Sequence, residues 1–175
     1  NLSLTFCLVI AALFGSVGSG FALPKCPGSP TNNSAIIDKW NNCFGVMSGV
    51  NAIKGTNGKT HRNASWVVKG KFRNGDTYGD VTYTVTGTGR ADIIYTGGWK
   101  NMTHHGFGKN IFVNQGGINY TGNFVNGYRS GKGTFRYLDG TYIGEFERDE
   151  KNGLGLYVFK NGTVKEGVWK NGKFL

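Results

Sequence analysis

The chain has 175 residues, which is enough for one domain with a buried core. Thirty residues are glycine, three are proline and 14% are aromatic, and this composition excludes both a collagen-like chain and a disordered Pro-Gly tract. The formal net charge of +10 favours anionic partners in general and selects none of them.

The N-terminal segment predicts export. No charged residue precedes Lys25, and the apolar run 4–14 is too short to span a bilayer, which needs about 20 residues. Gly20 and Ala22 are small residues placed as a signal-peptide cleavage site requires. We therefore predict that 1–22 is a secretory signal peptide cut after Ala22. An uncleaved membrane anchor is the alternative.

The leader and first hairpin, 23–67, contain both remaining cysteines. Cys26 and Cys43 form an even pair, and paired cysteines in an oxidising compartment form disulfides. We predict a Cys26–Cys43 disulfide, with two free thiols or an intermolecular bond as the alternatives. Residues 46–67 lack the regular glycine spacing of the later part of the chain, so we expect a longer, looser loop or an irregular hairpin there.

A repeat dominates the rest of the chain. Five units of the form Gly-x-aromatic recur at intervals of 22 to 27 residues: Gly70-x-Phe72, Gly97-x-Trp99, Gly122-x-Phe124, Gly144-x-Phe146 and Gly167-x-Trp169. Three of these units carry a tyrosine two residues before the glycine: Tyr95, Tyr120 and Tyr142. Three units continue into a Gly-x-Gly: Gly106 and Gly108, Gly131 and Gly133, Gly153 and Gly155. Asn-Gly and Asp-Gly dipeptides between the halves are typical of hairpin turns.

The period of a β-strand gives this pattern a physical meaning. In Tyr120-x-Gly122-x-Phe124, alternate side chains point to the same face. The glycine leaves a slot, which we expect an aromatic side chain from an adjacent strand to fill. One hairpin cannot bury its aromatic face alone, but stacked copies can. The pattern therefore predicts an all-β fold, an elongated single-layer array of antiparallel β-hairpins.

This pattern resembles the MORN repeat family. The units are 68–94, 95–119, 120–141, 142–164 and a partial 165–175, of which the two from 120 to 164 are the clearest. Met102 and Val81 stand where the pattern has glycine, and 84–94 holds an insertion. The leader resembles that of exported bacterial MORN proteins, in which a cysteine pair precedes the first hairpin.

The sequence offers little for catalysis or metal binding. His105 takes the position that Ser130 and Asn152 hold in the neighbouring units, so we expect a structural role for His104 and His105. The three histidines have no Cys or carboxylate at a ligand spacing, so neither a metal nor another cofactor is expected. Five Asn-x-Ser/Thr sequons would be glycan acceptors in a eukaryotic secreted protein. Because the leader looks bacterial, we interpret them as incidental: Asn32, Asn63, Asn101, Asn119 and Asn161.

The resemblance implies contacts with proteins, self-association or placement near membranes, with no activity of the repeats themselves. We therefore expect a non-enzymatic interaction or scaffold module with an unknown protein partner, in the periplasm or outside a bacterial cell, and no nucleic-acid partner. The charge and the aromatic residues suggest an alternative, peripheral binding to anionic lipid or polysaccharide. A third hypothesis, an enzyme acting on cell-wall carbohydrate, would use His105 with Glu145 or Asp149.

Overall fold

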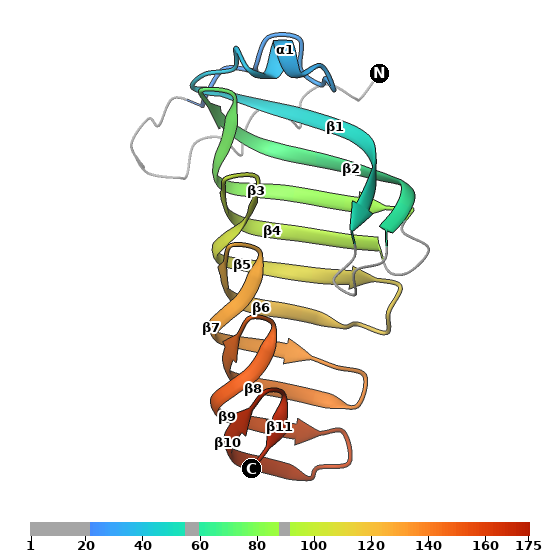
Figure 1. The fold of residues 1–175 in the computed structure, drawn as a ribbon, viewed down its shortest axis with the longest axis vertical. Helices are drawn as coiled ribbons and strands as arrows, with labels where there is room; N and C mark the ends of the chain where they lie inside the picture. The colour runs from blue at the N-terminus through green and yellow to red at the C-terminus, as the bar shows by residue number, and fades with distance from the viewer. Residues whose placement is uncertain (1–21, 55–59, 88–91) are drawn as a thin grey trace, which may run out of the picture.

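One continuous antiparallel sheet makes up most of the structure, a computed structural model that describes residues 22–54, 60–87 and 92–175. Within these residues each strand pairs with the next along the chain, so the sheet order equals the chain order. Figure 1 shows the hairpins stacked along the long axis, with the leader at one end and the C-terminus at the other. The all-β hairpin array expected from the sequence is confirmed. The predicted signal peptide lies outside the described residues, apart from Ala22.

The described residues contain one short helix, α1 (Ser34–Ile37), and eleven strands. The strands are β1 (Cys43–Lys54), β2 (Thr60–Arg73), β3 (Asp76–Thr86), β4 (Asp92–Lys100), β5 (Thr103–Val113), β6 (Asn119–Val125), β7 (Tyr128–Arg136), β8 (Gly140–Glu147), β9 (Glu150–Phe159), β10 (Val164–Lys170) and β11 (Lys173–Phe174).

Two-residue turns with positive φ close several hairpins. Between β6 and β7, Asn126 and Gly127 have φ of 50° and 87°, as a turn matching the right-handed twist of its strands requires. Met102, which replaces glycine in the β4–β5 turn, also has a positive φ of 57°. Equivalent pairs close three further hairpins: Asn74 and Gly75, Arg148 and Asp149, Asn171 and Gly172. The turn geometry is therefore kept even where the glycine is lost.

The segment 46–67 is more regular than the sequence suggested. β1 and β2 are long strands in continuous antiparallel register, apart from one shift after Asn51. The described parts of 46–67 therefore form a hairpin with one irregularity, as the second of the two expectations has it, and a loose loop is wrong. The hairpin has its own ring-over-glycine contact, because a Cβ built on Gly49 would lie 2.6 Å from Cζ2 of the paired Trp66. The Gly-x-aromatic spacing does not reveal this contact, because the aromatic residue lies on the partner strand.

Most of the described residues of the insertion at 84–94 belong to the sheet. β3 continues to Thr86 and β4 begins at Asp92, and Val85 pairs with Ile93 across the two strands. Val85 is buried and Ile93 is half-buried. The extra residues that are described therefore lengthen two paired strands and add to the core, because their β-branched side chains suit a half-buried sheet face.

The leader covers the edge of β1. The N–H of Cys26 donates to the carbonyl of Phe44 (2.9 Å), and the N–H of Thr31 donates to the carbonyl of Val46 (3.1 Å). These contacts form short parallel bridges beside β1. Because an unpaired strand edge can pair with other chains, the leader protects the N-terminal edge of the array.

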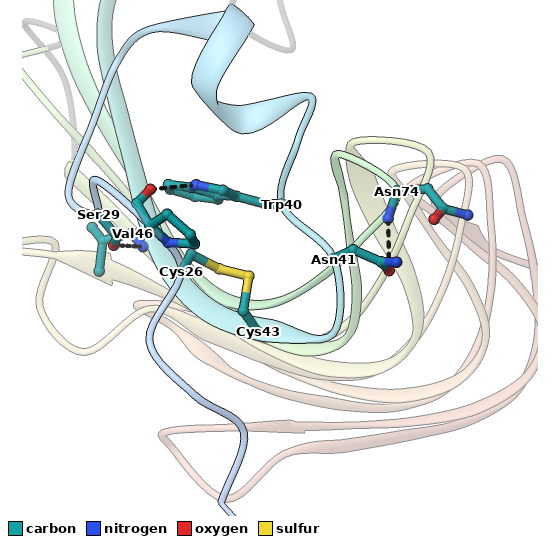
Figure 2. The surroundings of a disulfide bond; sticks show 8 residues. Cys26, Ser29, Trp40, Asn41, Cys43, Val46 and Asn74 are labelled. Carbon is teal, nitrogen blue, oxygen red and sulfur yellow. Dashed lines mark hydrogen bonds between the residues drawn. A yellow bond between two sulfur atoms is a disulfide. The ribbon is translucent and has the colours of Figure 1, made fainter.

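The leader also closes the core at this end. Cys26 and Cys43 form the disulfide predicted from the sequence. Figure 2 shows the ribbon of β1 bending around this disulfide and Trp40. Trp40 is fully buried and meets the ring of Phe72 edge-on, with centroids 4.6 Å apart. Both Trp40 and Cys26 lie where a Cβ on Gly45 would be, so this part of the leader acts as a cap on the first hairpin.

From β4 to β10 the centre of the sheet is built on a row of glycines in lateral register. Seven of them lie opposite one another across β4 to β10: Gly97, Gly108, Gly122, Gly133, Gly144, Gly155 and Gly167. Gly70 lies opposite Gly45 in the first hairpin, and a Cβ there would lie 2.7 Å from Cγ1 of Val81.

Tyrosine rings lie flat over this row. A Cβ on Gly122 would lie 2.5 Å from the Cα of Gly133 and would collide with the hydroxyl of Tyr120. The ring that covers Gly122 thus belongs to its own strand, and the expectation that an adjacent strand supplies it is wrong for this glycine. Tyr120 does reach across to Gly133 of the neighbouring strand. The Tyr120 side chain can lie along its strand because Gly122 and Gly133, which have no side chains, lie side by side there.

The tyrosine hydroxyls hold a bulge in place. After the glycine pair within each of the β4–β5, β6–β7 and β8–β9 hairpins the register shifts, as between Gly122 and Phe124, and one residue on the first strand then faces several on the second. Each hydroxyl donates to the carbonyl of that residue: Tyr95 to Gly98 (2.6 Å), Tyr120 to Asn123 (3.0 Å) and Tyr142 to Glu145 (3.0 Å). One side chain therefore both packs the glycine row and satisfies a buried polar group.

Replacing Gly122 with Val tests the glycine row. The branched side chain would displace Tyr120 and push β6 from β7, so we expect a loss of about 1–3 kcal/mol in the free energy of unfolding, measured by urea denaturation. Thr121→Val, on the opposite face of the same strand, should change stability by less than about 0.5 kcal/mol. Equal stability of the two variants would contradict the packing described above.

Candidate functional site

The two faces of the sheet differ in character. Tyr95, Tyr120 and Tyr142 lie on the face that we call the inner face, together with Trp40 of the leader. The residues that alternate with them lie on the outer face. The buried rings that form the continuous core all belong to the inner face, so this side of the array is packed for stability and the outer face is open.

On the inner face, four of the five Gly-x-aromatic rings have a glycine on one side and a variable residue on the other, whereas Phe72 lies between Cys43 and Thr77. Gly79, Gly106, Gly131 and Gly153 lie opposite Trp99, Phe124, Phe146 and Trp169, and all four glycines have positive φ. The variable residue lies across the hairpin from the ring: His104 opposite Trp99, Arg129 opposite Phe124, Lys151 opposite Phe146 and Phe174 opposite Trp169. The first three of these are basic side chains placed among aromatic rings.

Arg129 is fixed by rings and by an ion pair. Its guanidinium lies 4.7 Å from the ring centroid of Phe135 and 5.6 Å from that of Phe146. Its Nε donates to Oδ1 of Asp149 (2.9 Å) and its Nη2 to the carbonyl of the same residue (2.8 Å). Because Asp149 lies in the β8–β9 turn, Arg129 ties one hairpin to the next.

Lys151 lies among four rings. Its Nζ is 4.3 Å from the ring centroid of Trp169, 4.9 Å from Tyr157, 5.4 Å from Tyr137 and 5.6 Å from Tyr142. Burial lowers the pKa of this ammonium group, and the charge of Asp139 opposes that shift. Ring faces attract a cation most strongly when water is excluded, so Lys151 stabilises the packing of β9 on β10 as a charged side chain.

His104 occupies the position of Lys151 two hairpins earlier along the chain, and it is more deeply buried. Its ring stacks on Tyr95 at 3.8 Å between centroids and meets Trp99 and Phe124 edge-on, each at 5.3 Å. Burial lowers the pKa of His104 to about 4, against a smaller opposing effect of Asp149. His104 is therefore a neutral ring of the core near neutral pH.

The structure does not bring the residues of the hydrolase hypothesis together. His105 lies on β5 and Glu145 on β8, with β6 and β7 between them, so their strands are roughly 14 Å apart. Asp149 is held by Arg129. Within the described residues, no group of three or more His, Cys, Asp or Glu side chains could hold a metal ion. His105 Nδ1 is buried without a hydrogen-bond partner.

The outer face carries an apolar patch near the C-terminal end. Ile143 lies opposite Leu156, Leu154 opposite Val168, and Val158 opposite Val164. We call these six residues the outer patch. Four of them are exposed, and Leu154 is the most open at 65%. Neighbouring apolar side chains in register form a continuous surface, and such surfaces on soluble proteins mark interaction sites.

A basic cluster surrounds Phe44 on the outer face at the other end of the array. Lys25 bridges to Phe44, Lys71 pairs with it across β1 and β2, and Nζ of Lys69 lies 5.9 Å from its ring centroid. An open depression begins beside this ring, lined by Ala22, Leu23, Lys25, Phe44 and Lys71. Three exposed lysines around one exposed ring form a surface suited to an anionic partner.

Reasoning from the sequence missed the outer patch and the ring environment of Lys151. The outer patch could have been predicted from the sequence, because Ile143, Leu154 and Val168 each alternate with core residues and are apolar where a solvated face would be polar. The ring environment of Lys151 could not have been predicted, because Tyr137 and Trp169 come from different hairpins and contact Lys151 only when the hairpins stack.

The comparisons with known proteins agree with the repeat geometry. Two adjacent segments, 120–141 and 142–164, match the family model of the MORN repeat. They contain most of the β6–β7 and β8–β9 hairpins, 45 of the 175 residues. The comparison with curated proteins finds no match to this chain. Two MORN repeats are therefore shown, and the glycine row continues the same construction into β4, β5 and β10.

A search for membrane-spanning segments covered the residues that the structure describes. None of the helices there is long and apolar enough to cross a bilayer.

Replacing His104 with Phe, the residue at the equivalent position 174, tests the buried histidine. The unfolded chain takes up a proton near pH 6.5, whereas folded His104 resists it down to about pH 4. The wild-type protein should therefore lose on the order of 2–3 kcal/mol of stability from this group as the pH falls from 7 to 4, and little more below pH 4. The variant should lack this part of the pH dependence in urea unfolding. If the free energy of unfolding depended on pH in the same way for both proteins, His104 would not be buried from water and protons as described.

Proposed function

We propose that this protein is an exported, non-enzymatic scaffold that binds another protein through the outer patch, in the periplasm or outside a bacterial cell. MORN repeats are in general non-enzymatic modules, and two of them are present. The observation that carries the proposal is the outer patch, an apolar surface in register on β8, β9 and β10. Self-association through the same patch is the alternative within this proposal.

The charges around the outer patch favour a specific protein contact. Glu166 lies opposite Leu156, and the acidic pair Glu147 and Glu150 follows along β8 and β9. Lys170 lies on the same face of β10 as Val168, two residues further on. Glu166 thus interrupts the apolar row on β10, between Val164 and Val168, whereas Glu147, Glu150 and Lys170 lie around the patch. An apolar surface with charged residues around it is the usual anatomy of a protein interface.

The inner face is less suited to a protein partner. Its large rings are mostly buried and contact each other within the chain, as Tyr120 does with Phe124 and Phe146. Because these contacts are already made, an incoming protein would gain little apolar burial there.

Replacing Leu154 with Gln and Val168 with Thr tests the outer patch. Both changes remove apolar surface and keep the strand, so the variant should fold with a stability within about 0.5 kcal/mol of the wild type. We expect it to lose at least about tenfold in affinity for the partner, because central apolar residues of an interface contribute most of its binding energy. Quantitative co-purification with the mature protein from the native organism, and sedimentation velocity for self-association, measure this.

Phe107→Gln is the matched control. Phe107 and Leu154 have the same exposed fraction, 65%, and the same position in the Gly-x-Gly of their hairpins, but Phe107 lies on β5, away from the patch. The control should retain the partner. If both variants retain it, or both lose it equally, binding does not depend on the outer patch.

The basic cluster around Phe44 favours a second candidate function, peripheral binding to anionic lipid. Replacing Lys25, Lys69 and Lys71 with Gln should weaken co-sedimentation with phosphatidylserine vesicles by about 1 kcal/mol for each charge removed. The same three-charge change at Lys132, Lys160 and Lys170 is the control. Equal losses would indicate a general effect of net charge, and no binding by the wild type at low salt would remove this candidate.

A further inference from the structure

We propose that the inner face of β7 to β11 binds an acidic polysaccharide, with sugar rings stacked on its aromatic side chains and sugar carboxylates paired with Lys165 and Lys151. This site lies on the face opposite the outer patch and does not depend on it. The site consists of two lysines and three rings that are at least partly exposed: Lys151, Lys165, Tyr137, Phe159 and Phe174.

The charge of the site comes from two neighbouring ammonium groups. Lys165 is exposed, forms no salt bridge within the described residues, and lies close enough to Lys151 to lower its pKa further. The acidic group beside them is Asp139, whose Oδ1 accepts a hydrogen bond from the hydroxyl of Tyr157 (2.6 Å). Two positive charges against one negative charge leave the site able to hold a carboxylate.

The rings make a partly open shelf beside these charges. Nζ of Lys165 lies 5.8 Å from the ring centroid of Phe159 and 5.7 Å from that of Phe174, which is exposed. Tyr137 is half-buried and stacks on two buried rings, with its centroid 4.1 Å from that of Phe135 and 5.8 Å from that of Tyr157. Phe174 is therefore the most open ring of the site. Sugar rings have apolar C–H faces that pack flat on aromatic rings, whereas their hydroxyls and carboxylates stay at the edge. Flat rings with cations at the margin match that chemistry.

The repetition of the rings points to a polymer. Phe112, Tyr137 and Phe159 occupy the same position in three successive hairpins, four residues after the second glycine of each Gly-x-Gly, and all three are half-buried. Since each hairpin advances the sheet by two strands, these positions recur about every 9–10 Å along the array. A linear chain of sugars lying along the inner face would meet such a position at regular intervals.

A lipid membrane fits this face less well. Half-buried rings cannot insert into the boundary between headgroups and acyl chains, which is where amphipathic surfaces anchor. Tyr137 and Phe159 pack against the core and do not project from the surface. We therefore argue for the polysaccharide, and membrane binding becomes an outcome of the test.

Affinity electrophoresis of the mature protein, in gels containing polygalacturonate and in gels containing neutral dextran, tests the site. We expect retardation by polygalacturonate alone. Lys165→Gln should weaken it about two- to fivefold, as the loss of a partly exposed ion pair implies. Lys170→Gln, on the opposite face of the same strand, should leave it unchanged. Phe159→Leu, which keeps an apolar side chain and removes the ring, should also weaken binding, with the melting temperature recorded as a check on folding.

Four results would overturn the proposal. The first is the absence of retardation of the wild type at physiological ionic strength. The second is equal weakening by Lys165→Gln and Lys170→Gln, which would indicate net charge alone. The third is equal retardation by dextran, which would remove the role of the carboxylates. The fourth is binding to phosphatidylserine vesicles that depends on Lys165 while polygalacturonate fails to compete. None of these results bears on the outer patch, which its own variants test.

Discussion

The packing of a tyrosine ring over two paired glycines is the interaction on which the rest of this structure depends. Tyr120 covers Gly122 of its own strand and Gly133 of the next, and its hydroxyl donates to the carbonyl of Asn123. The contact joins two strands, fills the space left by the glycines and satisfies the backbone at the bulge. Tyr95 and Tyr142 make the same contact in their own hairpins. The array is therefore a series of equivalent tyrosine–glycine contacts, each of which requires glycine at the same positions.

The residue opposite each Gly-x-aromatic ring is free to vary within this scaffold. His104, Arg129, Lys151 and Phe174 all occupy that position. Each contacts rings, but they differ in charge and in what else they reach. Arg129 reaches the next turn through Asp149, whereas His104 is enclosed and stays neutral. Variation at this position changes the local electrostatics without changing the fold, because the glycine row and the turns set the backbone.

The two faces of a single-layer sheet allow two kinds of contact. The inner face has its large rings already paired and offers partly open rings with cations near its C-terminal end. The outer face carries exposed apolar side chains that lie in register near its C-terminal end. Covering the apolar outer face with another protein is favourable, because apolar surface is removed from water. The inner face suits a ligand that stacks on rings and pairs with charges.

The sequence by itself determined the fold class, the Asn-Gly turns at Asn74, Asn126 and Asn171, and the positions of the core rings. It did not reveal the turns at Asn101-Met102 and Arg148-Asp149, and the dipeptide Asn152-Gly153, which is typical of a turn, lies within β9. Period two, the recurring Gly-x-aromatic and the Asn-Gly dipeptides are local signals, and local signals suffice when each strand pairs with its neighbour along the chain. It also indicated the disulfide between Cys26 and Cys43. Only the tertiary structure decided which ring covers which glycine, that 46–54 and 60–67 form regular strands, and that Lys151 lies among rings from three hairpins. These features depend on how neighbouring strands slide past one another at the bulges, and no short stretch of sequence records that displacement.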